Sequence, residues 1–304
     1  MLNAKETILL ARKNETVIPA FNIPYLPMVE PVAQAVKDEN SVAIIHVARV
    51  EWEKFSAGSL EAVAGEYRKF EKPGHTLLGL DHVPVIDEDL KRVDYIPIIK
   101  RAIDAGYQSV MIDGSRLSLE ENIAATAEAA ELVHKQGLAC EGELGAVMGH
   151  ESGPIKPYEE IFESKLGFTD TEEARRFGKD SLCDWLSVAV GNIHGAVAEA
   201  TRHQKKPEAR LDVDHIAALY RATGIPLVLH GGSGIKLEYI RRGIKAGIAK
   251  INVGTEIRQA YEKGLEEAGG SVPKAQERLY RRVRELITDM EIADTKKLLG
   301  LSQN

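Results

Sequence analysis

Short apolar runs alternate with amphipathic segments along almost the whole chain. Several of the runs are continuously apolar, a pattern typical of parallel strands that are buried on both faces. The eight strands we expect are Val17–Phe21, Ser41–Val47, Thr76–Leu80, Ser109–Ile112, Ala139–Glu143, Trp185–Val190, Leu227–Leu229 and Lys250–Val253. The helices predicted between them are Met28–Lys37, Leu60–Phe70, Tyr95–Ala105, Leu119–Lys135, Val213–Ala222 and Leu237–Ala246.

This alternation predicts an α/β fold, a closed (β/α)8 TIM barrel that occupies residues 1–304 as a single domain. The alternative is an open doubly wound sheet, but the glycine-rich turn that such a sheet usually has after its first strand is missing. Residues 146–168 are polar and contain three glycines, so we expect a mobile active-site loop there. Residues 256–301 predict a charged C-terminal helical extension that lies on the surface or contacts another subunit.

Composition narrows the functional classes. With 304 residues, 44% of them hydrophobic, the chain can form a large core, and its longest apolar runs are strand-sized, so no membrane span is expected. Met1–Arg12 has no apolar signal-peptide core, and Cys140 and Cys183 are the only cysteines, so we predict a reducing cytoplasmic location. A net charge of −7 argues against nucleic-acid binding, whereas a pocket can still be positive for a small anionic substrate.

Three of the expected strands deliver a histidine near their carboxyl ends: His82, His194 and His230. In a closed barrel these ends share one face, where catalysis is found. Three imidazoles on that face could hold one metal ion and leave a coordination position open. Asp81 precedes His82, and both side chains can reach the site only if the strand ends there and the backbone turns. Asp81 then either performs acid–base chemistry or orients a ligand imidazole.

Glycine-bearing turns follow the seventh and eighth strands, at Gly231–Gly234 and Asn252–Thr255. Exposed backbone N–H groups there, at helix N-termini, predict a phosphate site, which barrel enzymes often place in these loops. Glu143 ends the fifth strand, and Glu151 lies in the expected loop, from which it could enter the site as a second acid or base.

Together these motifs resemble the class II, metal-dependent fructose- and tagatose-bisphosphate aldolase family. The matching stretches occur in the family's order, from about residue 19 to 258. They are Pro19–Asn22, Leu80–His82, Ser109–Ser115, Glu143–Gly145, Val188–Gly195, Leu227–Gly234 and Lys250–Glu256.

The resemblance implies a zinc-dependent aldolase that cleaves a phosphorylated ketose reversibly to dihydroxyacetone phosphate and an aldehyde through a metal-stabilised enediolate. It implies that His82, His194 and His230 bind one zinc ion per subunit, with Glu143 as a secondary ligand. Another divalent metal, and an additional monovalent cation, are compatible with it. It implies catalytic roles for Asp81, Glu151 and Asn252. The substrate and its phosphates are assigned to Asn22, Gly195, Gly231, Gly232, Ser233, Gly254, Thr255 and Arg258. Arg49 lies in a stretch that departs from the family, and its charge makes it a further candidate for binding the substrate. A homodimer or homotetramer is expected.

The chain retains the metal and first-phosphate elements of the family pattern, but the ends of its first two expected strands depart from that pattern. Gly79 stands where the family usually has a histidine, and His46–Trp52 replaces a Gln-x-Ser-x-Gly-like stretch. We therefore expect the aldehyde half of the substrate to differ from glyceraldehyde 3-phosphate, with His46 and Arg49 either binding another anion or serving the structure. Two other functions stay open: a metal-dependent sugar-phosphate epimerase or isomerase, and a non-catalytic accessory subunit of an aldolase.

Overall fold

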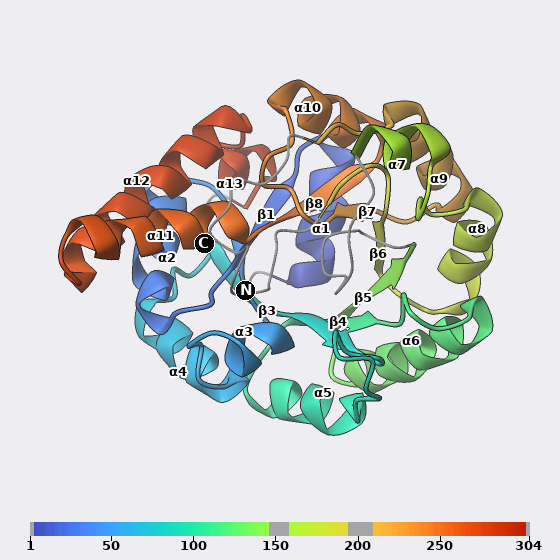
Figure 1. Ribbon diagram of the computed structural model, residues 1–304, viewed down its shortest axis with the longest axis horizontal. Helices are drawn as coiled ribbons and strands as arrows, with labels where there is room; N and C mark the ends of the chain where they lie inside the picture. Colours follow the sequence, from blue (N-terminus) through green and yellow to red (C-terminus); the bar gives the residue numbers. More distant parts are fainter. Residues whose placement is uncertain (1–2, 146–157, 194–208, 302–304) are drawn as a thin grey trace.

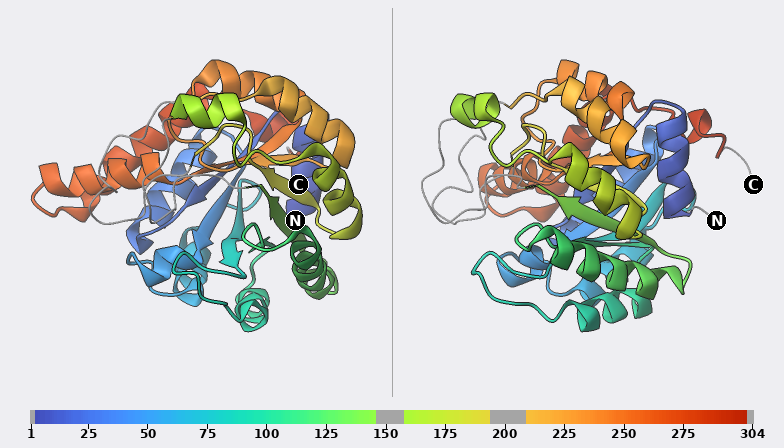
Figure 2. Two further views of the ribbon diagram at one scale, coloured as in Figure 1. Left: turned by 45° about the vertical axis from the view of Figure 1, so that its right-hand side comes forward. Right: turned by 90° about the vertical axis from the view of Figure 1, so that its right-hand side faces the viewer.

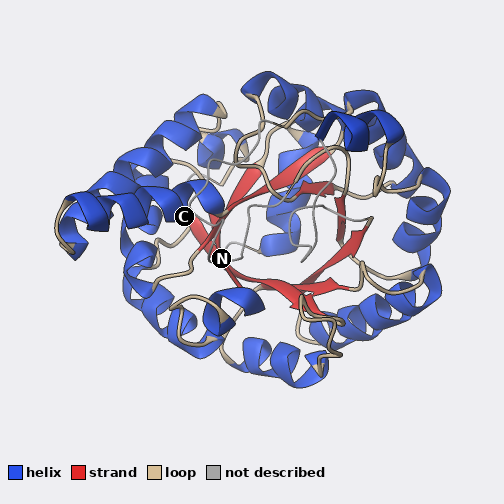
Figure 3. Cartoon of the chain, viewed as in Figure 1, coloured by secondary structure: helices blue, strands red, loops and turns tan. Residues whose placement is uncertain are grey.

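The computed structural model describes residues 3–145, 158–193 and 209–301. Eight parallel strands follow chain order around a closed barrel, and β8 pairs with β1 (Figure 3). The predicted barrel is confirmed, and all eight expected strands are present. They are β1 (Ile18–Asn22), β2 (Ala43–Ala48), β3 (Thr76–Pro84), β4 (Ser109–Asp113), β5 (Ala139–Leu144), β6 (Trp185–Val188), β7 (Leu227–Leu229) and β8 (Ile248–Val253).

Helices surround the barrel (Figure 1), and the six that the sequence predicted are α2, α4, α5, α6, α9 and α10. The ring also contains helices that the apolar pattern alone did not indicate. The helices from β1 to β8 in the described residues are η1 (Leu26–Met28), α2 (Val29–Asp38), α3 (Arg49–Glu53), α4 (Leu60–Phe70), α5 (Tyr95–Asp104), α6 (Leu119–His134), α7 (Tyr158–Ser164), α8 (Thr171–Asp180), α9 (Val213–Thr223) and α10 (Leu237–Ala246).

Two of the helices that the sequence did not predict, α7 and α8, follow β5. Helix α7 lies inside the stretch expected to be a loop, of which residues 146–157 fall outside the described residues. Helix α8 begins at an N-cap aspartate, Asp170, whose side chain accepts from the backbone N–H groups of Glu172 and Glu173. That cap and the acidic first turn are signals that the sequence carried.

Helix α1 (Ala4–Lys13) lies across the end of the barrel at which the strands begin (Figure 2). Its buried face, which includes Ile8, belongs to the same apolar cluster as strand-start residues such as Ile18 and Val42. The helix therefore closes the bottom of the barrel against water. Because this end is filled with apolar side chains, a polar site can form only nearer the carboxyl ends of the strands.

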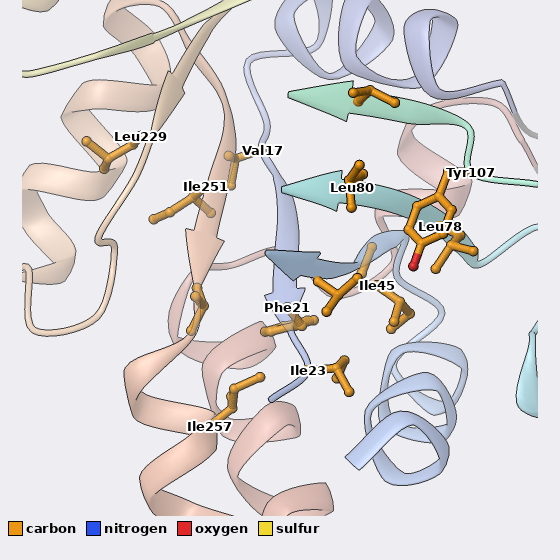
Figure 4. Close-up of a cluster of buried hydrophobic side chains, with 14 of the residues drawn as sticks. Val17, Phe21, Ile23, Ile45, Leu78, Leu80, Tyr107, Leu229, Ile251 and Ile257 are labelled. Atoms are coloured by element: carbon orange, nitrogen blue, oxygen red, sulfur yellow. The ribbon is translucent and has the colours of Figure 1, made fainter. Parts of the chain in front are cut away.

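A second apolar layer separates the strands from the surrounding helices. Figure 4 shows Phe21, Ile45 and Leu80 in this layer, and all three are at most 1% exposed. Both faces of the strands are thus buried, which accounts for their unbroken apolar runs.

The C-terminal extension forms helices α11 (Thr255–Glu267), α12 (Val272–Asp289) and α13 (Thr295–Leu298). Helix α12 packs beside α2 at one side of the ring (Figure 1), where Tyr280 donates a 2.8 Å hydrogen bond to Asp38. The predicted helical extension after the eighth strand is present, although it begins one residue earlier, at Thr255. Among the described residues, no helix has both the length and the apolar character needed to cross a membrane.

Candidate metal centre and active site

Asp81 and His82 reach the same site because of a β-bulge. The sequence predicted that β3 ends at Leu80, but the strand continues to Pro84. Its register against β4 shifts by one residue between Leu80 and Val83. A bulge inserts an extra residue and re-aims the side chains beside it. The sequence argument required the chain to turn at this point, and the bulge provides the reorientation without ending the strand.

The Asp81 carboxylate is held between two asparagine amides. Asn22 at the end of β1 donates to Oδ2 at 2.7 Å, and Asn252 on β8 donates to Oδ1 at 3.0 Å. All three residues are at most 7% exposed. Burial alone would raise the pKa of Asp81, but the positive charge of the neighbouring His82 outweighs it and holds that pKa well below its ordinary value. The carboxylate is therefore ionised and can accept a proton.

The rings of His82 and His230 meet edge to face, with Nε2 of His82 2.8 Å from Nδ1 of His230. Each ring is oriented by a carboxylate on its other nitrogen. Nδ1 of His82 lies 3.2 Å from Oδ2 of Asp113, and Nε2 of His230 lies 2.8 Å from Oε1 of Glu141. Carboxylates in this position fix the ring orientation of metal-binding histidines and increase their basicity.

The donor set of this site suits a divalent metal ion. The ligand atoms of Asp81, His82 and His230 lie within 4.8 Å of one another. Glu143 is buried nearby, with Oε2 3.8 Å from Nδ1 of His82 and no hydrogen-bond partner in the described part of the chain. Burial and the adjacent Asp113 carboxylate raise the pKa of Glu143 well above its ordinary value, so it is neutral without a cation. Two imidazoles with a nearby carboxyl suit zinc and related transition metals.

Without a cation, a proton lies between the two rings. Burial would lower the pKa of His82, but the charges of Asp81 and Asp113 raise it to about 10. Burial lowers the pKa of His230 despite its bond to Glu141. The consistent assignment is that protonated His82 donates to neutral His230, whose own N–H is donated to Glu141.

This proton makes metal binding dependent on pH. Ligands must be deprotonated to bind, so each cation bound at neutral pH is expected to release about one proton from His82. Because the pKa of His82 lies near 10, affinity should rise as pH increases toward that value. Isothermal titration of chelator-treated protein with zinc, in buffers of different ionisation enthalpy, measures the proton count. Metal affinity that does not change between pH 6.5 and 8.5 would contradict the assignment.

A buried ion pair lies next to the candidate metal centre. Lys250 is fully buried, and its Nζ lies 2.7 Å from Oε2 of Glu141 and 2.7 Å from Oδ1 of Asn252. The indole of Trp185 also donates to Glu141, at 2.6 Å. Burial would raise the pKa of Glu141, but Lys250 and His230 lower it to about 2. Lys250 therefore keeps the carboxylate that orients His230 charged, and it also holds the amide that contacts Asp81.

The sequence predicted that Lys250 begins the last strand, and it suggested no role for this residue. The strand in fact begins at Ile248, and a register shift against β7 between Leu227 and Val228 follows its first residues. Asp113 and Glu141 also received no role. Glu141 and Glu143 alternate on a buried strand, which could have indicated two carboxylates on one inner face.

Asp113 offers a direct test of the metal centre. Asp113→Asn removes the charge that orients His82, so metal affinity is expected to fall by about 10–100-fold. Asp184→Asn is the matched control, because Asp184 forms a similar pair with His134, at 2.9 Å, at the opposite end of the barrel. Competition with a chromophoric chelator gives both affinities. Equal metal affinities for Asp113→Asn and Asp184→Asn would show that Asp113 does not support metal binding.

The two predicted phosphate turns lie side by side. The backbone N–H of Gly232 donates to the Asn252 carbonyl at 3.0 Å, and Ser233 Oγ accepts from the Glu256 N–H at 3.3 Å. Helix α11 begins at Thr255, directly after Gly254. Gly231 adopts a φ of 63°, which favours glycine. The turn after β7 thus sits at the N-terminus of α11, an arrangement suited to an anion.

Other predicted site residues have structural partners. Arg49 Nη1 lies 3.5 Å from Asp87, and Arg258 is buried with its guanidinium 2.7 Å from Glu262. His46 lies inside the barrel, 1% exposed, and is therefore not at the open surface of the site. The remaining predicted residues, Glu151, His194 and Gly195, lie outside the described residues, so their roles stay predictions.

Comparison with known proteins agrees with this architecture. The family model for class-II fructose-bisphosphate aldolase matches residues 2–300. A fructose-bisphosphate aldolase of Staphylococcus aureus (strain Mu50 / ATCC 700699) is 29% identical over 300 residues, 99% of this chain and 91% of that protein. The 6-phospho-5-dehydro-2-deoxy-D-gluconate aldolase of Shouchella clausii is 31% identical over 253 residues, which cover 78% of this chain and 81% of that protein.

Among solved structures, the YdjI aldolase from Escherichia coli K12 superposes with a TM-score of 0.75 at 26% identity, covering 96% of this chain and 98% of that one. The resemblance seen in the motifs thus extends over essentially the whole chain and its fold. The chain belongs to the class-II fructose-bisphosphate aldolase family.

Proposed function

We propose that this lyase is a metal-dependent aldolase that cleaves a phosphorylated ketose reversibly to dihydroxyacetone phosphate and an aldehyde. The observation that carries the proposal is the Asp81 carboxylate, ionised, buried and held by Asn22 and Asn252 beside the paired rings of His82 and His230. A base fixed next to a candidate metal centre is what retro-aldol chemistry at neutral pH requires.

The residues divide the reaction between them. Asp81 accepts the C4 hydroxyl proton during cleavage and returns it during condensation. Asn252 contacts the negatively charged oxygen that cleavage generates and also fixes Asp81. His82 and His230, with His194 as the third ligand, would hold a divalent cation, which as a Lewis acid stabilises negative charge beside the substrate carbonyl. The turns at Gly231–Ser233 and Gly254–Thr255 bind the phosphate of dihydroxyacetone phosphate. Glu151 remains the proposed acid for the carbon proton.

The substrate proposed for this chain is a ketose phosphate other than fructose 1,6-bisphosphate. Arg49, a candidate for binding the far end of the substrate, is instead paired with Asp87 at 3.5 Å and with Glu53 at 3.8 Å. Part of its charge is therefore compensated before any second phosphate could bind. The Shouchella clausii relative is likewise named for 6-phospho-5-dehydro-2-deoxy-D-gluconate rather than for fructose bisphosphate.

A coupled assay for dihydroxyacetone phosphate tests the activity and the substrate together. Purified protein of measured metal content is presented with a panel of ketose mono- and bisphosphates, before and after chelation and after addition of zinc. We expect turnover that chelation abolishes and metal restores, with a monophosphate preferred. Best turnover on fructose 1,6-bisphosphate would contradict the substrate proposal. Epimerised ketose without cleavage, or no turnover by metal-loaded protein, would contradict the aldolase itself.

A further inference from the structure

His46 fills the space that Gly79 leaves open. The two residues are direct partners across β2 and β3, so their side-chain positions share the inner face of the barrel. A Cβ atom added to Gly79 would lie 2.5 Å from Nε2 and 2.6 Å from Cδ2 of His46. Distances this short exclude any side chain at position 79 while the His46 ring is in place. The His46 ring can therefore occupy this position only because residue 79 is glycine.

This ring lies beside the proposed catalytic base. Nδ1 of His46 is 3.5 Å from Oδ1 of Asp81, and both side chains are at most 4% exposed. Asp81 follows Gly79 by two residues on the same strand, and its register partner is Ala48, which follows His46 by two residues. The imidazole thus sits diagonally below the carboxylate, on the side away from the open end of the barrel.

The facing nitrogen of His46 has no other role among the described residues. Nδ1 is completely buried and lacks a hydrogen-bond partner, which is unusual because buried polar atoms are nearly always paired. At 3.5 Å the approach to Asp81 is longer than a normal hydrogen bond, and a movement of about 0.5 Å would close it. Catalytic contacts commonly tighten in this way when substrate binds.

We propose that His46 is a positioning residue for Asp81, holding the carboxylate toward the substrate from the space that Gly79 provides. The inference rests on the proposed aldolase function. It also joins two departures from the family pattern, since the histidine missing at position 79 is matched by an imidazole supplied from the neighbouring strand. His46 accordingly acts through Asp81 and does not bind a substrate anion.

His46→Ala removes the ring, and its expected effect is a fall in kcat for ketose phosphate cleavage of about 10–100-fold, with KM changed less than threefold. His75→Ala is the matched control, because His75 is also a buried histidine. It directly precedes β3 at the opposite end of the barrel, with Nδ1 2.9 Å from the Ser41 carbonyl. The control should keep its kcat within twofold. Equal kcat values for the two variants would overturn the positioning role.

A second readout separates positioning from general damage. Exchange of the carbon-bound proton of dihydroxyacetone phosphate with solvent does not involve the C4 hydroxyl. His46→Ala should therefore retain exchange within about threefold of the unaltered protein while cleavage falls. A Cβ atom at position 79 would also lie 2.8 Å from Oγ of Ser109, so the rescue variant combines His46→Ala, Gly79→His and Ser109→Ala. It returns an imidazole to the same space from β3 and should recover most of the lost kcat. Parallel loss of exchange and cleavage, or a rescue variant no better than His46→Ala, would count against the inference.

Failure of the proposed function would look different, because the unaltered protein would then cleave no ketose phosphate. In that case a crystal structure of His46→Ala still decides the positioning role. An Asp81 carboxylate that keeps its contacts with Asn22 and Asn252 unmoved would overturn it, and a rotated carboxylate would support it. If His46→Ala does not fold, His46→Gln keeps a polar group at this position and takes its place in each measurement.

Discussion

Replacing Asp81 by asparagine is expected to lower kcat for ketose phosphate cleavage by about 10³-fold in protein that folds and has been loaded with metal. A positioned general base contributes about 10²–10⁴-fold, and asparagine has a similar shape but cannot accept the proton. Asn22 and Asn252 donate to the two carboxylate oxygens at 2.7 and 3.0 Å, and the single amide oxygen of the variant can keep one of these two hydrogen bonds. The coupled assay for dihydroxyacetone phosphate, run on protein of measured metal content, gives the ratio of the two kcat values.

Two controls make this result specific to the base. The circular dichroism and melting temperature of Asp81→Asn should stay close to those of the unaltered protein. Proton exchange on dihydroxyacetone phosphate should survive, because it does not require the C4 hydroxyl. A variant that cleaves within tenfold of the unaltered rate would show that another group takes the proton.

Lys250→Met is expected to destabilise the protein by about 3–5 kcal/mol, the range found when one partner of a buried ion pair is removed. The substitution leaves Glu141 charged and fully enclosed, and it also removes the donor that lies 2.7 Å from Oδ1 of Asn252. Lys250 is the main cause of the low pKa of Glu141, so that pKa should rise in the variant. Urea titration followed by circular dichroism gives the change in unfolding free energy.

Lys69→Met is the matched control for this change. Lys69 forms an equally short pair with Glu66, at 2.6 Å, but its side chain is 65% exposed. Exposed pairs contribute about 0–1 kcal/mol, so the control should lose little stability. Similar losses of unfolding free energy in both variants would mean that burial does not make the Lys250–Glu141 pair more important for stability than an exposed pair. Because Glu141 orients His230, we also expect Lys250→Met to bind metal more weakly.

The sequence by itself determined the barrel. Apolar runs such as Ser41–Val47 predicted strands buried on both faces, and the amphipathic segments between the runs predicted helices. These are local signals, because side-chain direction repeats over only a few positions in a strand or a helix. Since the strands of a closed barrel end on one face, the sequence also indicated that His82 and His230 would come together, and their ring nitrogens lie 2.8 Å apart.

Only the tertiary structure decided which way the side chains of this site point and which buried residues hold them in place. The bulge in β3 that directs both Asp81 and His82 inward changes the strand's period of two at a single position, and no periodic pattern predicts it. The contact between Glu141 and Lys250 joins residues 109 positions apart, on strands that are not neighbours in the barrel. Such contacts exist only after the sheet closes, because closure brings the inner faces of distant strands to the same axis.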